Sequence, residues 1–356
     1  MNKPDTNAIR VMLVDDSQLT LNILSKRLNQ YPDLEVVATA HDGGEALPLV
    51  ANVKPDIVCT DLHMKGMDGL EFTRRVMSTT PVPILVVTVS AIPNDQSRVF
   101  QLLKAGAIDI MQKPSGGFSP DSRQAIDSLA RRIRIVAGVT PFQRFHGRPP
   151  STETSRPQAP PQLIAIGAST GGPVALQGLL SALPAAFPVP ILIAQHISAG
   201  FLGGLIEWLA PHVSVRCAIA HHGQRISAGE ILFAPDGARC QIDAYMRIQI
   251  ETGTSRLSRT IDPLLESCAD ALGSHSAGIL LTGMGDDGSQ GLNRIRRAGG
   301  WTAVQDSESC LVSGMPYSAL RLNPGHTVGT PTELAAALTS IADNTRGDGA
   351  NDHEPT

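Results

Sequence analysis

The chain has 356 residues, of which 42% are hydrophobic and 17% charged, and its formal net charge is −4. This length and composition predict a globular protein with two cores of about 150 residues each, and the acidic balance disfavours nucleic acid as the main partner. No apolar run approaches the roughly 20 residues that span a bilayer, and the N-terminus lacks a secretory signal, so we expect a cytoplasmic protein without membrane insertion. The five cysteines form no Cys-x-x-Cys pair and indicate neither a zinc knuckle nor a disulfide framework.

Short apolar runs alternate with segments of helical spacing in the first part of the chain. The runs are Ile9–Val14, Leu34–Ala38, Ile57–Cys59, Ile84–Val89 and Ala107–Met111. Between the first two runs, one helix face is formed by Leu19, Ile23, Leu24 and Leu28. This alternation predicts a five-stranded parallel sheet covered by helices.

Polar residues stand at the ends of these expected strands. Asp15 and Asp16 follow the first strand, Asp61 the third, Thr88 ends the fourth and Lys113 follows the fifth. Because ligands of open parallel sheets collect at the carboxyl ends of the strands, we expect these side chains to border one crevice. Three neighbouring carboxylates repel one another unless a divalent cation neutralises them, and oxygen ligands of this kind suit Mg²⁺. The alternative, that each acidic residue is only a turn former, is disfavoured by five matching positions.

Residues 8–128 resemble the receiver domain of two-component response regulators, which has a flavodoxin-like fold. The resemblance rests on Val14-Asp-Asp-Ser17, Asp61-Leu-His-Met64, Met67-Asp-Gly69 and Lys113-Pro114. The roles that it implies are phosphoacceptor for Asp61; Mg²⁺ ligand for Asp15, Asp16, Asp61 and, through its backbone carbonyl, His63; and switch pair for Thr88 and Lys113.

Two positions depart from the receiver pattern. Lys65 stands where the family usually has proline. Ile110 stands three residues before Lys113, where the family usually has an aromatic residue. Loss of that ring removes a group that commonly reports phosphorylation at the domain surface. We therefore expect phosphotransfer to persist, and the sequence leaves open how the signal leaves this domain.

A proline-rich segment divides the chain. Residues 138–160 are poor in aliphatic side chains and predict a linker between a receiver domain at 1–137 and a second domain at 161–343. Residues 344–356 contain no large apolar side chain and are expected to form a disordered tail. The second domain has apolar runs at Leu163–Ile166, Ile191–Ala194, Ile231–Ala234 and Gly278–Leu281, and its clearest helices are expected at Ala175–Leu183 and Gly203–Leu209. This pattern predicts a second doubly wound parallel α/β domain.

The first apolar run of the second domain leads directly into Gly167-Ala-Ser-Thr-Gly171. A Gly-x-Ser-x-Gly turn between a strand and a helix presents Ser169 as a nucleophile would be presented. The glycines allow a sharp turn, and the following helix offers unpaired N–H groups to a developing oxyanion. Taken alone, the pentapeptide also fits an ordinary glycine turn of an α/β crossover.

A serine nucleophile needs an imidazole base that is oriented by a carboxylate. His196 follows the run Ile191–Ala194, and Asp286 and Asp287 lie in a glycine-rich turn after Gly278–Leu281, so all three are expected at the same edge of the sheet. The glycine-rich turn fits a phosphate cradle equally well. Competing histidines are His212, His221, His222 and His275.

Residues 161–340 resemble the catalytic domain of the CheB family, the chemotaxis protein-glutamate methylesterases. The shared motifs are Ile166-Gly-Ala-Ser-Thr-Gly-Gly-Pro173, Gln195-His196, Leu281-Thr-Gly-Met-Gly-Asp-Asp-Gly288, Gln305-Asp306, Glu308-Ser-Cys310 and Gly314-Met-Pro316. The resemblance implies that Ser169 is the nucleophile, His196 the general base and Asp287 its orienting carboxylate. It also implies that the backbone N–H of Met284 contributes to the oxyanion hole and that the esterase uses no cofactor.

Two segments depart from the CheB pattern. The family commonly has His-Arg-Pro-Ser-x-Asp where this chain has Leu257-Ser-Arg-Thr-Ile-Asp262, and its Ala-Pro-Gly becomes Ala234-Pro-Asp-Gly237. Both changes fall in expected substrate-contact loops and leave the triad intact. The reaction class is therefore predicted more firmly than the receptor on which the enzyme acts.

The resemblance implies a phosphorylation-regulated esterase that demethylates, and also deamidates, the cytoplasmic part of methyl-accepting chemotaxis receptors. A chemotaxis histidine kinase would be the phosphodonor, and the receiver would cover the catalytic site until Asp61 is phosphorylated. A rival interpretation is a receiver fused to a non-catalytic α/β module that binds a partner or nucleotide through Gly167–Gly172. Dinucleotide binding is disfavoured because Ser169 occupies the second glycine position of that fingerprint.

Overall fold

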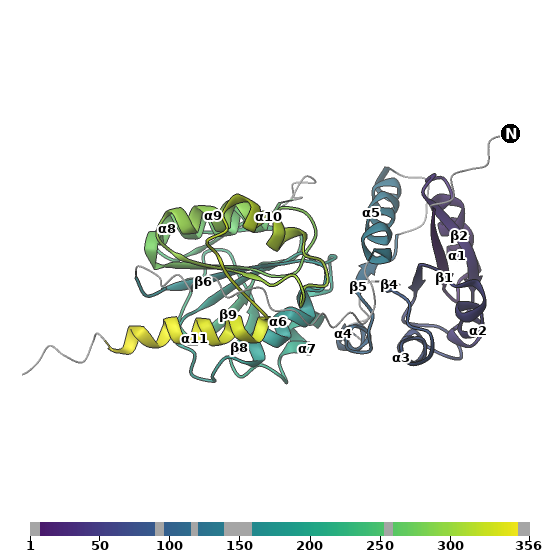
Figure 1. The fold of residues 1–356 in the computed structure, drawn as a ribbon, viewed down its shortest axis with the longest axis horizontal. Coiled ribbons are helices and arrows are strands. Elements are labelled where there is room, and N and C mark those ends of the chain that lie inside the picture. The colour runs from purple at the N-terminus through teal and green to yellow at the C-terminus, as the bar shows by residue number, and fades with distance from the viewer. Residues whose placement is uncertain (1–7, 90–95, 115–119, 139–158, 253–258, 348–356) are drawn as a thin grey trace, which may run out of the picture. The chain divides into compact units, whose positions relative to one another are not determined.

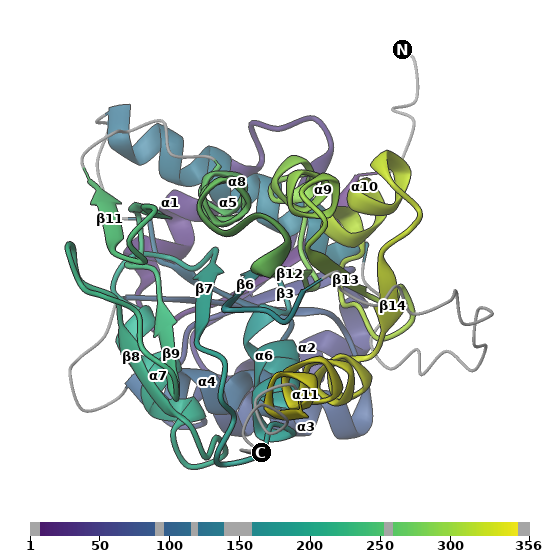
Figure 2. The same cartoon turned by 90° about the vertical axis from the view of Figure 1, so that its left-hand side faces the viewer.

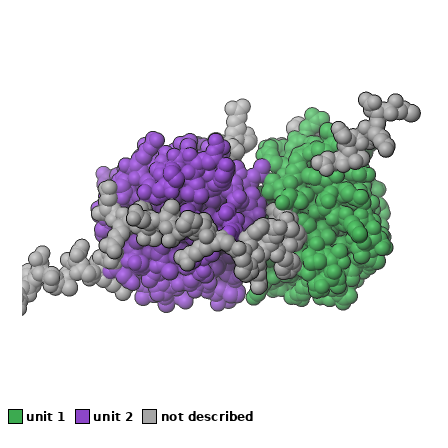
Figure 3. All heavy atoms as spheres, in the orientation of Figure 1, with its two compact units in different colours: residues 1–143 green, residues 144–356 purple. Residues whose placement is uncertain are grey.

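The computed structural model describes residues 8–89, 96–114, 120–138, 159–252 and 259–347. The chain divides into two compact units, residues 1–143 and 144–356, which are coloured separately in Figure 3. Most of the expected linker and the end of the expected tail lie outside the described residues. Among the described helices, none has both the length and the apolar character needed to cross a membrane.

The first unit alternates strands and helices, as its apolar runs predict. Its elements are β1 (Ile9–Val14), α1 (Gln18–Leu28), β2 (Leu34–Ala40), α2 (Gly43–Val53), β3 (Ile57–Thr60), α3 (Gly69–Thr79), β4 (Ile84–Thr88), α4 (Gln96–Lys104), β5 (Asp109–Gln112) and α5 (Pro120–Ala137). The strands pair in parallel in the order β2-β1-β3-β4-β5, which confirms the expected five-stranded sheet. The order changes direction between β1 and β3, so a crevice opens at their carboxyl ends.

Local sequence signals explain where the first three helices begin. Ser17 precedes α1 and its hydroxyl accepts a hydrogen bond from the backbone of Thr20 at 3.3 Å. Asp42 caps α2 and Asp68 caps α3 through the backbone N–H of Glu71 at 2.9 Å. Such side chains satisfy N–H groups that the helix itself leaves unpaired.

The second unit is built on a larger parallel sheet. Its strands are β6 (Leu163–Ala168), β7 (Ile191–Gln195), β8 (Arg216–Ile219), β9 (Glu230–Phe233), β10 (Arg239–Ile242), β11 (Ile248–Glu251), β12 (Ser276–Leu280), β13 (Trp301–Gln305) and β14 (Thr327–Gly329). Its helices are α6 (Gly172–Ser181), α7 (Leu202–Leu209), α8 (Ile261–Leu272), the short η1 (Gly273–His275), α9 (Ser289–Arg297), α10 (Gly314–Leu322) and α11 (Pro331–Gly347).

Seven of these strands form one sheet in the order β14-β13-β12-β6-β7-β9-β8, and every pairing within it is parallel. Helices α8, α9 and α10 cover one face, and α6, α7 and α11 cover the other (Figures 1 and 2). Strands β6, β7, β12 and β13 are buried throughout because both faces are covered. The strand order changes direction between β6 and β12, so the carboxyl ends of these two strands border the crevice of this unit.

The structure adds elements to those expected from the sequence. Strands β10 and β11 form an antiparallel hairpin outside the main sheet, and β8, β13 and β14 extend the sheet at its edges. Helix α11 continues to Gly347, four residues into the segment 344–356 that was expected to be a tail. Adding a turn to an existing helix gains one hydrogen bond for each residue that becomes ordered, and it avoids the cost of starting a new helix. A segment with few apolar residues can therefore continue α11.

Candidate functional site

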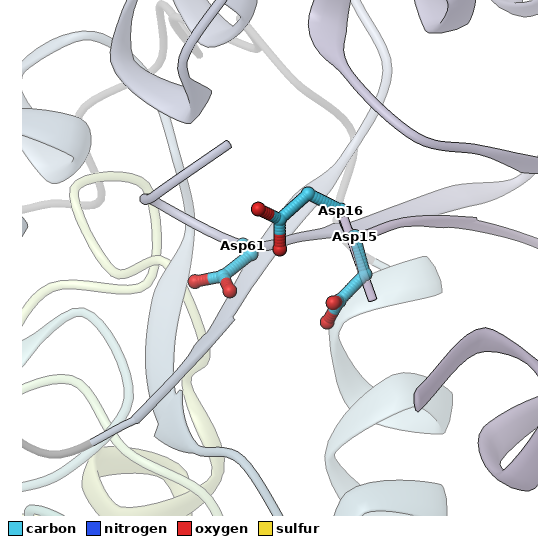
Figure 4. Close-up of side chains that lie close together, drawn as sticks. All are labelled: Asp15, Asp16 and Asp61. Carbon is cyan, nitrogen blue, oxygen red and sulfur yellow. The ribbon is translucent and has the colours of Figure 1, made fainter. Parts of the chain in front are cut away.

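The first candidate site lies at the crevice between β1 and β3. Asp15 and Asp16 follow β1 and Asp61 follows β3, and one carboxylate oxygen from each lies within 4.8 Å of the others (Figure 4). Asp15 and Asp61 are buried, whereas Asp16 is exposed. The sequence therefore predicted correctly that these three side chains lie together.

Lys113 brings a positive charge into this cluster. Its Nζ lies 2.6 Å from Asp15 Oδ2 and 2.5 Å from Asp61 Oδ2. Burial raises the pKa of Asp15 even though Lys113 donates a hydrogen bond to it. Burial opposes the charge of Lys113, yet its hydrogen bonds to Asp15 and Asp61 raise its pKa above the ordinary value. The lysine is therefore held protonated beside the carboxylates.

The Asp61 carboxylate is oriented by its own loop. Its Oδ1 accepts hydrogen bonds from the backbone N–H of Leu62 at 2.7 Å and of His63 at 3.4 Å. Thr88 lies at the end of β4, and its backbone carbonyl accepts a hydrogen bond from Lys113 N at 2.7 Å. The Thr88 hydroxyl is buried, and among the described residues it has no hydrogen-bond partner. A buried hydroxyl in this state is poised to pair with a group that enters the crevice.

The oxygen set fits a hard divalent cation. Three carboxylates within 4.8 Å of one another provide the ligand type that Mg²⁺ prefers, and their mutual repulsion is only partly offset by Lys113. Asp15, Asp16 and Asp61 are the side chains that would hold the ion.

The second candidate site begins at the turn after β6. Ser169 is buried, and its backbone N–H donates to the Thr282 carbonyl at 3.0 Å. Gly171 has φ +79°, a left-handed conformation that favours glycine, and it precedes α6. A Cβ at Gly172 would lie 2.1 Å from Gln195 Oε1, so the turn also requires glycine there. These constraints hold Ser169 in a tight strand-to-helix turn.

His196 and Asp287 meet beside this turn. The backbone N–H of His196 donates to the Ala168 carbonyl at 2.8 Å, which places the histidine alongside Ser169 in the register of the sheet. His196 Nε2 lies 2.9 Å from Asp287 Oδ2. The sequence expectation that Ser169, His196 and Asp287 stand at one edge of the sheet agrees with these positions.

Asp287 is anchored at the start of α8. Its Oδ2 accepts hydrogen bonds from the backbone of Thr260 and Ile261 at 2.9 and 3.1 Å, and its Oδ1 accepts one from Asp262 at 2.9 Å. Burial opposes the charge of Asp287, but the hydrogen bonds from His196 and from the backbone hold its pKa below the ordinary value. A helix N-terminus stabilises such an anion, so Asp287 stays ionised beside the imidazole.

The position of Asp287 determines which imidazole nitrogen is available as a base. An ionised carboxylate can only accept, so the neutral His196 ring carries its proton on Nε2 and leaves Nδ1 as the acceptor. In the described part of the chain, none of the hydrogen bonds joins the Ser169 hydroxyl to His196. Catalytic hydrogen bonds are often long without substrate and tighten when it binds.

Met284 lies next to the Ser169 turn. Gly283 approaches so closely that an added Cβ would lie 2.7 Å from Ser169 Cβ and 2.2 Å from Met315 Sδ. Loop residues on both sides hold Gly283 in place, because its N–H donates to Val312 and its carbonyl accepts from Met315. Among the described residues, no hydrogen bond uses the Met284 backbone N–H, so this donor is available to a reacting oxygen.

We expect Gly283→Ala to lower kcat for ester hydrolysis by about 10²-fold, because the new methyl group must displace Ser169 or Met315. Steady-state kinetics together with thermal unfolding measure the effect. Gly178→Ala on α6 is the control, since its added Cβ meets only Pro331 Cβ at 3.4 Å. Equal kinetics in the two variants would contradict the close approach.

Two glutamines connect the loops around Ser169, and the sequence motifs gave them no role. Gln195 Nε2 donates to the carbonyls of Ser169 and His196, both at 2.9 Å. Gln305 Oε1 accepts from Thr282 N at 2.8 Å. Each is a polar residue at the end of a buried strand and belongs to a motif shared with the CheB family, and these are the sequence signals that could have indicated a role.

The departures from the CheB motifs also have structural consequences. Asp236, in the altered segment after β9, accepts a hydrogen bond from the backbone N–H of Gly200, in the loop that follows His196. Arg259 contacts Asp262, whose backbone N–H donates to Asp287, and Asp286, which directly precedes Asp287 in sequence. Residues 257 and 258 lie outside the described residues.

Comparisons with known families agree with the two units. The response regulator receiver domain model matches residues 11–118, and the CheB methylesterase model matches residues 164–338. The chain is thus a response regulator whose output domain is an esterase.

Relatives extend this agreement over nearly the whole chain. A protein-glutamate methylesterase/protein-glutamine glutaminase of Methanospirillum hungatei is 39% identical, covering 94% of this chain and 99% of that protein. One from Hahella chejuensis is 37% identical, covering 93% of this chain and 98% of that protein. The Thermotoga maritima CheB methylesterase catalytic domain is 27% identical over 51% of this chain and 98% of that domain, with a TM-score of 0.48. The chain belongs to the CheB family of protein-glutamate methylesterase/protein-glutamine glutaminases.

Proposed function

We propose that Ser169 attacks the γ-carbonyl carbon of a methylated glutamate on a methyl-accepting chemotaxis receptor. His196 takes the hydroxyl proton through Nδ1, and Asp287 stabilises the imidazolium through Nε2. The proton then passes to the leaving methoxide, methanol departs and water hydrolyses the acyl-enzyme. The observation that carries this proposal is the 2.9 Å contact of His196 with Asp287 beside the Ser169 turn.

The developing oxyanion has a donor nearby. The backbone N–H of Met284 follows Gly283, which lies against Ser169, and the start of α6 adds the partial positive charge of a helix N-terminus. Loss of one such donor costs about 3–4 kcal/mol of transition-state stabilisation. A glutamine side chain would react through the same acyl-enzyme with ammonia leaving, which accounts for a glutaminase activity at the same site.

Asp61 is the proposed phosphoacceptor of the receiver. Mg²⁺, when bound by Asp15, Asp16 and Asp61, would neutralise charge on the incoming phosphoryl group. Lys113 would pair with a phosphoryl oxygen, and the unpartnered Thr88 hydroxyl is placed to donate to another. The phosphodonor would be a chemotaxis histidine kinase in the cytoplasm, and phosphorylation would raise the esterase activity.

We expect Asp61→Asn to remove all phosphoryl uptake from a small phosphodonor, because the amide cannot form the acyl phosphate. Intact-mass measurement should show one added phosphoryl group on the wild type with Mg²⁺ and none after chelation. Asp33→Asn, which removes an exposed ion pair with Arg134, is the matched control and should be phosphorylated like the wild type. Uptake by Asp61→Asn would assign the modification to another residue.

A further inference from the structure

Two carboxylates contact one arginine beside the His196–Asp287 pair. Arg259 Nη2 lies 2.7 Å from both carboxylate oxygens of Asp286, and its Nη1 lies 3.0 Å from Asp262 Oδ2. Asp287 directly follows Asp286 in sequence, and its Oδ1 accepts the backbone N–H of Asp262. The single guanidinium thus contacts both acidic neighbours of the carboxylate that faces His196.

The cluster is built from parts that are distant in sequence. Asp262 is 6% exposed, and its second oxygen, Oδ1, accepts the backbone N–H of Gly291 at 2.9 Å. Burial raises the pKa of Asp262, and the charge of Asp287 raises it further, whereas Arg259 lowers it. Arg259 stands where the CheB motif has proline, so this contact is a feature of the present chain.

We propose that Arg259 is a positioning residue that balances the charges of Asp262 and Asp286 and thereby limits the negative potential acting on the His196–Asp287 pair. This inference rests on the proposed function of the His196–Asp287 pair. Without the guanidinium, the two flanking carboxylates would add their negative potential to that of Asp287. A more negative surrounding favours the imidazolium, which cannot accept the Ser169 proton.

Other charged groups around the pair do not replace Arg259. Other acidic side chains on the surrounding elements are Asp236 after β9, Glu266 and Asp270 on α8, and Asp306 and Glu308 after β13. Arg294 of α9 pairs with Asp270 at 2.6 Å, near the other end of α8 from Asp262. Strands β6, β7 and β12, which carry the site, contain no charged residue. Within the residues that the structure describes, Arg259 is the cation that pairs with both Asp262 and Asp286.

The test is a set of variants in the full-length protein that change the local charge in both directions. Arg259→Gln should shift the His196 titration to higher pH, and Asp286→Asn should shift it to lower pH. The double variant restores the wild-type charge and should return the pKa close to its original value. Arg259→Lys keeps the charge and should leave the pKa unchanged while losing the bidentate contact.

Two readouts follow the same variants. Imidazole NMR titration reports the His196 pKa directly, and the acidic limb of kcat/KM for methanol release reports it through catalysis. Arg294→Gln, which breaks an exposed ion pair of the same unit, is the control and should shift neither readout.

Opposite shifts in the single variants with recovery in the double variant would support charge balance. An unshifted pKa in Arg259→Gln, or a double variant that stays as shifted as Arg259→Gln, would overturn it. If the wild type releases no methanol, the proposed function fails, and the NMR titration still decides the charge balance at His196.

Discussion

Replacing Ser169 by alanine is expected to lower kcat for glutamate methyl ester hydrolysis by about 10⁴-fold or more, because alanine lacks the hydroxyl that forms the acyl-enzyme. Ser169 occupies a turn in which Gly171 has a positive φ and neither Gly172 nor Gly283 has room for a side chain. Because these glycines set the shape of the turn, we expect the smaller alanine side chain to fit at position 169 without rearrangement of the backbone. Thermal unfolding should change little while turnover disappears.

The control for this variant is Ser181→Ala at the end of α6, where the hydroxyl only contacts the Gly178 carbonyl at 3.5 Å. It should keep wild-type turnover. Receptor binding by Ser169→Ala should also persist, because the substitution removes one hydroxyl from a buried position. Substantial hydrolysis by Ser169→Ala would favour the non-catalytic module that the sequence left open.

Asp287→Asn is expected to lower kcat by about 10⁴-fold as well, for a different reason. The carboxylate holds the Nε2 proton of His196 and so leaves Nδ1 as the base. An amide can donate to Nε2 and would then stabilise the opposite tautomer. It also lacks the charge that stabilises the imidazolium in the transition state.

The same substitution should destabilise the second unit. Asp287 accepts three backbone N–H groups at the start of α8, and an amide offers one oxygen in place of two. Hydrogen bonds to a charged group contribute about 1.5–3 kcal/mol each, so thermal unfolding should begin at a lower temperature. Asp270→Asn, on an exposed part of α8, is the control and should preserve activity. Wild-type turnover in folded Asp287→Asn would exclude Asp287 as the orienting carboxylate.

The sheets were predictable where strands are short and mostly apolar. β1, β3, β4, β6 and β7 satisfy this condition, because helices cover both faces of each sheet. β8 mixes exposed and half-buried positions at the sheet edge, and β14 has only three residues, so neither has a periodic signal. The hairpin of β10 and β11 depends on packing against α8, which a local pattern does not encode.

The sequence predicted which residues form the candidate sites, but only some of the contacts that hold them in place. Position at the carboxyl ends of the predicted strands was enough to group the receiver carboxylates. It was also enough to expect Ser169, His196 and Asp287 at one edge of the second sheet. The anchoring of Asp287 depends on backbone groups 25 to 27 residues away in sequence. The hydrogen bond between Arg259 and Asp286 likewise joins residues 27 positions apart. Such contacts follow from the packing of α8 against the β12 loop and have no signature in either segment alone.

The most direct test of the account is methanol release from carboxyl-methylated receptor membranes by the full-length protein. The wild type, Ser169→Ala and Asp61→Asn would be compared with and without Mg²⁺ and a small phosphodonor. The account predicts release that requires Ser169 and that rises with phosphodonor only when Asp61 is present. Methanol release that persists in Ser169→Ala would contradict the assignment of Ser169 as the nucleophile. Wild-type release that is the same with and without phosphodonor would contradict control by Asp61.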